Sequence, residues 1–422
     1  MYKKIDLKNN VRLVLNHMPK MESASIGIWV ATGSRDEDKE LSGISHFLEH
    51  MIFKGTPSRS TRDIKEEIEG RGGSLNGFTS EELTCYLAKV SHEHVGIAID
   101  VLSDMALYAS INSKEVEKER NVIIEEIKMY EDLPNHLVHD VLHEMMWPEH
   151  ALGRNIAGDI KTVSRIGRKE LVSYKRSAYI PKNMAVVICG NLKTGKIIKK
   201  VKKIFDSRDS LKPKDIIEFK NNQSEAKIRI FNKDTAQSRL SMGIHAFGKL
   251  HKDRYALSLL HIILGANMSS RLFDNLREKR GLAYEIGTEI KKYKDTGAFV
   301  VNAGMEHAKV KEGVSLILKE LKKIKNHPVP KNELKRAKEF FKVQVLLALE
   351  DTMDHMLWLG EKTMTQDKLP NKNRLIKKIT SLTSGDLQRV ARDVFKKENL
   401  NIAIVGPMKD KEKDSIESSI DL

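Results

Sequence analysis

Two histidines and a glutamate with the spacing of a metal site stand near the start of the chain. In GISHFLEHMIFKGT, residues 43–56, His46 and His50 are four residues apart and Glu49 directly precedes His50. On a helix, side chains four residues apart lie on one face, so both imidazoles can bind a single ion. Zinc accepts imidazole nitrogens at about 2.0–2.1 Å, and a nearby carboxylate can take a proton from water that the ion acidifies. The spacing therefore predicts two metal ligands and a general base, and an amphipathic helix with solvated histidines is the alternative.

A catalytic zinc ion usually has three protein ligands, so a third is expected from another element. The helix predicted over residues 113–132 offers Glu119, Glu125 and Glu126. Glu119 and Glu126 are two turns apart and share a face, whereas Glu125 points about 100° away. These considerations alone leave both Glu125 and Glu126 open as the third ligand.

A second pair of histidines has the same spacing. In HLVHDVLHE, His139 and His143 are four residues apart, and Glu144 follows the second histidine. The glutamate comes after the pair, and no strong third ligand is nearby in the sequence. A surface or core helix is therefore the better interpretation, with a metal site as the alternative.

Length and composition limit the class of protein. A chain of 422 residues with 40% hydrophobic residues is expected to form two or three domains. No apolar run approaches the roughly 18 residues that a membrane-spanning helix needs, and the N-terminal residues lack the features of a signal peptide. The two cysteines, Cys85 and Cys189, lie in apolar runs and indicate a reducing compartment. We expect a cytoplasmic protein without a membrane span.

The net charge of +15 is unevenly distributed along the chain. Residues 1–160 contain 18 Lys and Arg against 27 Asp and Glu, and the remaining residues contain 55 against 31. Aromatic residues do not alternate with the lysines of the second part, as a nucleic-acid stacking surface would require. Such lysine runs are typical of the solvated faces of amphipathic helices. A nucleic-acid-binding protein is therefore an alternative that we do not favour.

An internal repeat indicates two copies of one domain. The segment GRKELVSYKRSAYIPKNMAVVICGN matches a segment 216 residues later, so that Leu171 aligns with Leu387 and Gly190 with Gly406. A looser match pairs KMYEDLPNHLVHDVLHEMM with LLALEDTMDHMLWLGEKTM at an offset of 219. Nearly constant offsets over distant segments are the mark of a duplicated unit of about 200 residues.

Each copy mixes strand-like and helix-like segments without a regular alternation. This pattern predicts an α+β fold of two homologous domains, each a mainly antiparallel sheet with helices packed on one face. We place the first domain at residues 1–208 and the second at 226–422. The polar segment 209–225 is predicted to link them.

The chain resembles the pitrilysin/insulinase family of zinc peptidases, in the branch with mitochondrial processing peptidase and its bacterial relatives. GISHFLEHMIFKGT resembles the inverted His-x-x-Glu-His motif of that family, and ERNVIIEEIKMYEDLP resembles the segment with its third ligand. The resemblance selects Glu126 as that ligand, about 76 residues beyond the second histidine. It also implies that Glu119 supports the site from behind the ligands.

Two further segments of the resemblance concern the substrate. GGSLNGFTSEEL resembles a strand whose edge pairs with an extended peptide, which implicates Asn76, Gly77 and Phe78 in substrate binding. Taken alone, Asn-Gly would instead predict a hairpin turn. SSRLFDNLREKRGLAY resembles the segment that brings Arg277 and Tyr284 to the catalytic cleft, where they would contact the substrate carbonyl and the developing oxyanion. Nearby Arg280 is the competing arginine, and surface residues at a helix end are the plain alternative.

The second copy has lost the metal pattern. At an offset of 215, His261 aligns with the first ligand, but Leu264 and Gly265 replace the base and the second histidine. At an offset of 219, Val345 replaces the third ligand. This half is expected to supply substrate contacts rather than a second ion.

The resemblance implies a zinc endopeptidase with one Zn²⁺ per chain, which cuts unfolded peptides or small polypeptides inside a closed cavity. It also implies that the chain pairs with itself or with a related subunit. The alternative is a non-catalytic scaffold or partner subunit of a processing-peptidase-like complex, against which the complete set of ligands and base argues.

Overall fold

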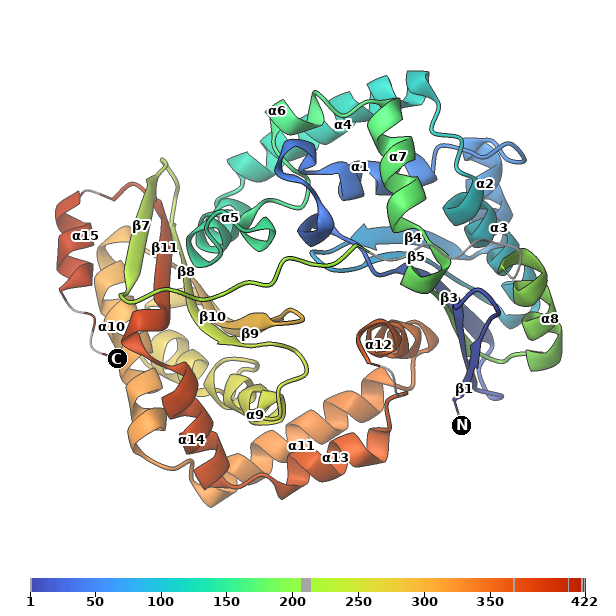
Figure 1. Ribbon diagram of the computed structural model, residues 1–422. Helices are drawn as coiled ribbons and strands as arrows, with labels where there is room; N and C mark the ends of the chain where they lie inside the picture. Colours follow the sequence, from blue (N-terminus) through green and yellow to red (C-terminus); the bar gives the residue numbers. More distant parts are fainter. Residues whose placement is uncertain (1, 206–213, 367–368, 409, 419, 421) are drawn as a thin grey trace. The chain divides into compact units, whose positions relative to one another are not determined.

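The computed structural model describes residues 2–205, 214–366, 369–408, 410–418, 420 and 422 (Figure 1). The chain forms two compact units, and each draws on three separate segments of the sequence. The first unit comprises Met1–Lys128, Arg154–Ile217 and Leu346–Asn371. The second comprises Met129–Gly153, Glu218–Val345 and Lys372–Leu422.

The first unit is built on a six-stranded sheet with the strand order β1-β2-β6-β3-β5-β4. Neighbouring strands are antiparallel except for β2 and β6, which are parallel. Strand β4 therefore lies at one edge of the sheet and β1 at the other. The strands are β1 (Lys3–Asp6), β2 (Arg12–His17), β3 (Ser23–Val30), β4 (Ser74–Thr79), β5 (Thr84–Ser91) and β6 (Met184–Gly190).

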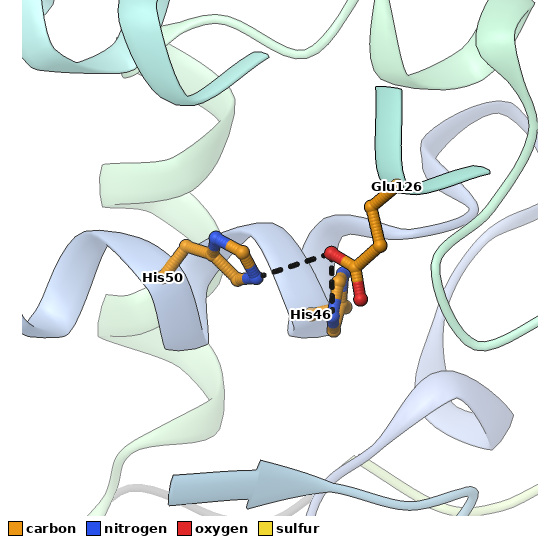
Figure 2. Close-up of side chains that lie close together, drawn as sticks. All are labelled: His46, His50 and Glu126. Atoms are coloured by element: carbon orange, nitrogen blue, oxygen red, sulfur yellow. Dashed lines mark ion pairs between the residues drawn. The ribbon is translucent and has the colours of Figure 1, made fainter. Parts of the chain in front are cut away.

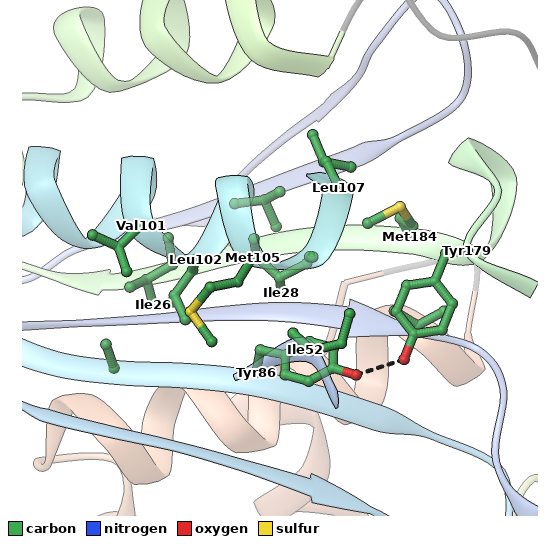
Figure 3. Packing of buried hydrophobic residues seen from close by; sticks show 14 of the residues in the cluster. Ile26, Ile28, Ile52, Tyr86, Val101, Leu102, Met105, Leu107, Tyr179 and Met184 are labelled. Atoms are coloured by element: carbon green, nitrogen blue, oxygen red, sulfur yellow. Dashed lines mark hydrogen bonds between the residues drawn. The ribbon is translucent and has the colours of Figure 1, made fainter. Parts of the chain in front are cut away.

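Helices cover one face of this sheet and enclose the larger apolar core of the unit. Figure 3 shows Ile26 and Ile28 of β3 packed beneath Leu102 and Met105 of α3, in a cluster whose residues are almost fully buried. The helices of this part of the unit are α1 (Ile44–Ile52), α2 (Thr61–Ile68), α3 (Val95–Tyr108), α4 (Ser113–Asp132), α6 (Ile160–Val163), α7 (Arg168–Ala178) and α8 (Thr194–Phe205).

The opposite face of the first sheet is covered by α12 (Thr352–Thr365), which comes from the second half of the sequence. Met356 and Leu359 of this helix pack against Trp29 and neighbouring apolar residues of the sheet. The hydroxyl of Thr352 also lies 2.9 Å from those of Ser23 and Ser25. Because both faces of the sheet are covered, β3 is buried along almost its whole length.

The second unit has a five-stranded sheet with the order β7-β11-β8-β10-β9, in which only the β7–β11 pair is parallel. Its strands are β7 (Lys227–Asn232), β8 (Ser238–Phe247), β9 (Ala283–Lys292), β10 (Thr296–Met305) and β11 (Leu400–Gly406). Its helices are α5 (Pro134–Met146), α9 (Arg254–Leu264), α10 (Val310–Asn326), α11 (Lys331–Ala348), α13 (Lys372–Ser381), α14 (Ser384–Val394) and α15 (Asp410–Glu417). α5 packs on β8 and β11, on the face away from the main core of this unit.

The repeat found in the sequence coincides with matching elements. At the offset of 216, α7 falls on α14 and β6 on β11; at the offset of 219, α5 falls on α12. The halves thus exchange equivalent helices, because α5 covers the sheet of the second unit and α12 covers that of the first. The contiguous limits 1–208 and 226–422 stay a prediction of where the copies begin and end. Of the predicted linker, residues 209–213 lie outside the described residues, and 214–225 form neither helix nor strand.

No single helix within the described residues is both long and apolar enough to cross a membrane. One pair, His92–Tyr108 and Ser113–Asp132, meets the criteria of length and composition together, with a bend of 97° between its members.

Candidate metal centre

Helix α1 presents its chemistry-bearing residues on one side. Its apolar residues are buried in the core of the first unit, whereas His46, Glu49 and His50 stay partly exposed. The rings of the two histidines lie 4.7 Å apart between centroids. The i,i+4 spacing thus places both imidazoles on one face, as the sequence predicts.

Glu126 of α4 faces both histidines (Figure 2). Its Oε2 atom lies 3.8 Å from Nε2 of His46 and 3.6 Å from Nε2 of His50. Donors that are each about 2.0–2.1 Å from one tetrahedral ion lie roughly 3.4 Å from one another. The three donor atoms lie within 4.8 Å of one another, so they would move closer together to hold a single zinc ion. Among the described residues, this trio is the only group of three or more His, Cys, Asp or Glu side chains close enough to hold a metal.

The electrostatics of the site favour ligation. Burial, with a contribution from nearby His50, lowers the pKa of His46 to about 3. His46 is therefore neutral at physiological pH, and neutral imidazole is the form that binds a metal. The Nδ1 atom of His46 is buried and has no hydrogen-bond partner within the described part of the chain.

Glu119 supports His50 from the side away from Glu126. Its Oε2 atom lies 3.1 Å from Nδ1 of His50, and its Oε1 atom lies 2.5 Å from the ammonium of Lys54. With Nδ1–H donated to this carboxylate, Nε2 of His50 is left with a lone pair directed toward Glu126. The sequence interpretation named Glu119 but not Lys54, which follows the end of α1 at Ile52 and so lies outside the helical periodicity.

Glu49 is held by the strand that borders the site. The hydroxyl of Thr79, the last residue of β4, donates a hydrogen bond of 2.6 Å to Oε2 of Glu49. Burial raises the pKa of Glu49 above its ordinary value, and the bond from Thr79 opposes this shift in part. The carboxylate is thus oriented and its proton affinity increased, both of which suit a general base. The sequence interpretation named residues 76–78 of this strand but not Thr79.

Asn76, Gly77 and Phe78 lie within the edge strand β4, so the alternative of a hairpin turn at Asn-Gly is wrong. Gly77 pairs with Tyr86 of β5. A Cβ atom at Gly77 would lie 3.1 Å from the ring of Phe53, a tight contact that the ring would have to relieve by a small shift. Among the described residues, no strand neighbours β4 on its outer side, and an extended peptide can pair with such an edge.

Arg277 and Tyr284 lie together in the second unit. The guanidinium of Arg277 is 5.3 Å from the centre of the Tyr284 ring and 4.8 Å from that of Phe273. Tyr284, near the start of β9, is 76% exposed. Arg280 instead donates to the backbone carbonyl of Asn275. Arg277 and Tyr284 are thus paired on the surface of their unit, and their approach to the metal site stays a prediction.

The competing sites have structural explanations. Glu125 is exposed and pairs with Lys128 at 2.8 Å, so it is not a member of the trio. Nδ1 of His139 lies 4.0 Å from Oε1 of Glu289, and among the described residues no group of three possible metal ligands includes His139. In the second copy, Nδ1 of His261 lies 2.7 Å from the hydroxyl of Thr288.

Comparison with known proteins identifies the family of the chain. The family model described as insulinase (peptidase family M16) matches residues 12–160, and the model described as peptidase M16 inactive domain matches residues 165–341. The chain belongs to the M16 peptidase family. Within this family, the metal trio and Glu49 fall in the segment that matches the insulinase model, and Arg277 and Tyr284 fall in the segment that matches the inactive-domain model.

M16 relatives cover almost the whole chain. A Bacillus subtilis (strain 168) protein named uncharacterized zinc protease YmxG is 35% identical over 96% of this chain and 98% of the relative. A Streptomyces coelicolor protein named uncharacterized zinc protease SCO5738 is 32% identical over 98% of this chain and 91% of the relative. The structure of a protease from Helicobacter pylori has a TM-score of 0.90 at 24% identity, covering 96% of this chain and 99% of that one, and shows the same fold.

Proposed function

We propose that this M16 chain is a zinc endopeptidase of the inverted His-x-x-Glu-His type. The observation that supports this most directly is the approach of one carboxylate oxygen of Glu126 to both Nε2 atoms, from His46 and His50, across two separate helices. His46, His50 and Glu126 would hold one zinc ion, which when bound polarises a peptide carbonyl and increases the acidity of water. The names of the relatives, which describe zinc proteases, support the choice of metal.

Glu49 is the proposed general base and, later in the reaction, the acid that protonates the leaving amine. It adjoins His50 without belonging to the trio, and Thr79 fixes one of its oxygens. Because its pKa is raised, a proton taken from water is held more firmly and can then be passed to the amine nitrogen. His50 is kept in one tautomer by Glu119, so that only Nε2 is offered to the ion.

The proposed substrates are unfolded peptides or small polypeptides. The free edge of β4 would take such a segment as an added strand, with Asn76, Gly77 and Phe78 opposite its backbone. Thr79, at the end of the same strand, contacts Glu49, so a peptide on this edge would run beside the proposed base. Arg277 and Tyr284 would supply a cation and a phenol hydroxyl to the reacting carbonyl.

We also infer, from the family, that the active particle contains two chains that enclose a cavity, either as a homodimer or with a related subunit. The cytoplasm is the proposed compartment. Light scattering coupled to size-exclusion chromatography measures the mass of the particle and tests the dimer directly.

Replacement of the proposed base tests the reaction. Glu49→Gln keeps the volume of the side chain but cannot take a proton, so turnover of a quenched unfolded peptide should fall by about 10²–10⁴-fold. Zinc content, measured by atomic absorption, should stay at one ion per chain. Glu125→Gln, the same change at an exposed site on α4, should alter neither. Equal turnover by Glu49→Gln would rule out its role as the base.

The alternative function is that of a non-catalytic partner subunit, which the match to an M16 inactive domain keeps open. This function predicts that the wild-type chain cleaves no peptide alone, and that a complex with a second subunit cleaves equally well when this chain carries Glu49→Gln. Turnover by the isolated wild-type chain, lost in Glu49→Gln, would exclude it.

A further inference from the structure

Helix α1 has no side-chain cap of its own. The first N–H groups of a helix lack partners inside the helix, and a Ser, Thr, Asp or Asn at the N-cap usually accepts a hydrogen bond from one of them. Here the N-cap is Gly43, in the left-handed region with φ of 95°. A Cβ atom at Gly43 would collide with the backbone carbonyl of Ala157. The helix therefore cannot obtain a cap by substitution at this position.

Glu37 supplies the cap from outside the helix. Its Oε2 atom accepts a hydrogen bond of 2.8 Å from the backbone N–H of Gly43, and its Oε1 atom accepts one of 2.8 Å from that of Ser45. Glu37 is only 6% exposed. Burial raises the pKa of its carboxyl to about 7. The hydrogen bonds from the N–H groups of Ser45 and Gly43 favour the charged form and so partly oppose this rise. A buried carboxylate is costly unless hydrogen bonds compensate it, and both of its oxygens are used here.

The surroundings of Glu37 fix it in place. Arg154 donates a hydrogen bond of 2.7 Å to the backbone carbonyl of Glu37. On the helix side, the hydroxyl of Ser45 lies 2.7 Å from that of Tyr174, which lies 3.1 Å from Thr32. The first turn of α1 is thus tied to the rest of the first unit at both its backbone and Ser45.

The backbone groups that Glu37 caps are next to one proposed metal ligand. With Gly43 as the N-cap, Ser45 is the second residue of the helix and His46 the third, so His46 lies in the first turn. His50 is oriented by Glu119, whereas Nδ1 of His46 has no hydrogen-bond partner in the described part of the chain. The direction of the His46 imidazole therefore depends on the backbone of the first turn, which Glu37 holds.

We propose that Glu37 is the positioning residue of the metal helix, and that its two hydrogen bonds to the first turn of α1 aim His46 at the ion. This role rests on the proposed ligand set of His46, His50 and Glu126. It gives the two histidines separate supports: Glu119 acts on the side chain of His50, and Glu37 acts on the backbone beneath His46.

Glu37→Gln tests this role, because the amide keeps the volume but offers one acceptor oxygen and places an NH₂ group against a backbone N–H. Removing a supporting partner of a metal ligand typically weakens metal binding about 10–100-fold, and we expect at least a 10-fold loss of zinc affinity by chelator competition. The visible absorption bands of the Co²⁺-loaded protein should also change, because they report the geometry of the ligands. Both are measured well above pH 7, because the pKa of Glu37 is about 7 and its carboxyl is mostly charged only there.

Asp36→Asn is the matched control. Asp36 is the neighbouring carboxylate, and it accepts a hydrogen bond of 3.0 Å from the backbone N–H of Gly33, at a turn that does not belong to α1. Neutralising it disturbs the same loop but should leave zinc affinity and the Co²⁺ spectrum unchanged. Tyr174→Phe, which removes only the hydroxyl beside Ser45, should weaken zinc binding less than Glu37→Gln does. It provides the test if the Gln variant does not fold, which the thermal midpoint of the metal-free protein would reveal.

The outcomes separate this role from the ligand set itself. A weaker affinity and an altered spectrum in Glu37→Gln, with Asp36→Asn like the wild type, would support the positioning role. Wild-type zinc affinity in a folded Glu37→Gln variant would overturn the positioning role, and so would equal losses of affinity in Glu37→Gln and Asp36→Asn. If Glu37→Gln does not fold, wild-type zinc affinity in Tyr174→Phe would overturn it. In each case zinc binding by the wild type would still support the ligand set. A wild-type chain that bound no zinc would overturn the ligand set and the positioning role together.

Discussion

The hydroxyl of Thr79 and the carboxylate of Glu49 are joined by a hydrogen bond of 2.6 Å. Thr79 ends the edge strand β4, and Glu49 lies on the metal helix α1. The bond therefore connects the strand proposed to bind the substrate with the group proposed to move the proton. In this proposal the same strand binds the peptide and fixes the position of the base.

Thr79→Val should lower kcat about 10-fold, since a hydrogen bond to a charged group contributes roughly 1.5–3 kcal/mol and only part of this is expected to be used in catalysis. Valine has the shape of threonine but cannot hold Glu49, so zinc content should not change. Steady-state kinetics and metal analysis measure the two effects. Thr79→Ser keeps the hydroxyl and should retain most of the activity. An equal loss in both variants would show that the methyl group, rather than the hydrogen bond, matters.

Glu119→Gln should weaken zinc binding about 10–100-fold by chelator competition, while the protein stays folded. The carboxylate fixes the tautomer of His50 and balances the charge of Lys54, and a glutamine does neither as well. Glu125→Gln changes the same type of residue on the same helix, at an exposed position paired with Lys128, and should keep full affinity. The assignment of roles along α4 is wrong if the two variants bind zinc equally.

The candidate residues within α1 could be predicted from the sequence, whereas those that other segments bring to α1 could not be predicted from spacing alone. His46, Glu49 and His50 follow from helical spacing, because the periodicity of a helix fixes which residues share a face. The choice of Glu126 over Glu125 needed either a family resemblance or the observed exposure of Glu125, since both glutamates belong to one helix. No periodic pattern connects Glu37 with a helix that starts seven residues later, because a short 3-10 helix (Lys39–Leu41) and the left-handed Gly43 separate them.

The fold shows the same division. The mixture of strand-like and helix-like segments predicted the α+β class, and the repeat coincides with α7, β6, α14 and β11. The exchange of α5 and α12 between the sheets left no local signal, because each helix has an apolar face that would suit either sheet. Complementary shapes select the partner instead, as where Gly360 of α12 lies against Trp29.

Asp351→Asn should make the stability of the first unit less dependent on pH. Asp351 pairs with Lys89 of β5 at 2.5 Å and caps α12 by accepting from the N–H groups of Met353 and Asp354. Burial opposes its charge, but Lys89 and these N–H groups outweigh burial and hold the pKa below its ordinary value. A lowered pKa stabilises the folded state above the unfolded pKa of about 3.9, and this contribution is lost as the pH falls through the folded pKa.

The wild type should therefore lose stability more steeply than Asp351→Asn below about pH 5, with the two converging once the pH is below the lowered pKa of Asp351. At neutral pH the variant should be less stable by about 0.5–1 kcal/mol, because the pair is partly exposed and asparagine remains a good cap. Urea unfolding across this pH range measures the difference. Lys89→Gln should give the same neutral-pH loss, and the double variant should lose no more than either single one. Additive losses would mean that the two residues act independently.

Gly360→Ala should destabilise the first unit by about 2 kcal/mol or more, since overpacking a filled core costs typically 1–3 kcal/mol and alanine's advantage in a helix is much smaller. A Cβ atom at Gly360 would collide with the indole of Trp29, so α12 would have to move away from the first sheet. The indole cannot move aside easily, because Trp29 is 2% exposed and its ring packs edge-on against that of Phe78, with 5.7 Å between the ring centroids. Thermal unfolding followed by circular dichroism measures the loss. Gly195→Ala is the matched control in α8, where a Cβ atom would meet nothing within 4 Å, and it should be neutral or slightly stabilising. If both variants unfold at the wild-type temperature, then α12 does not cover the first sheet in the way described.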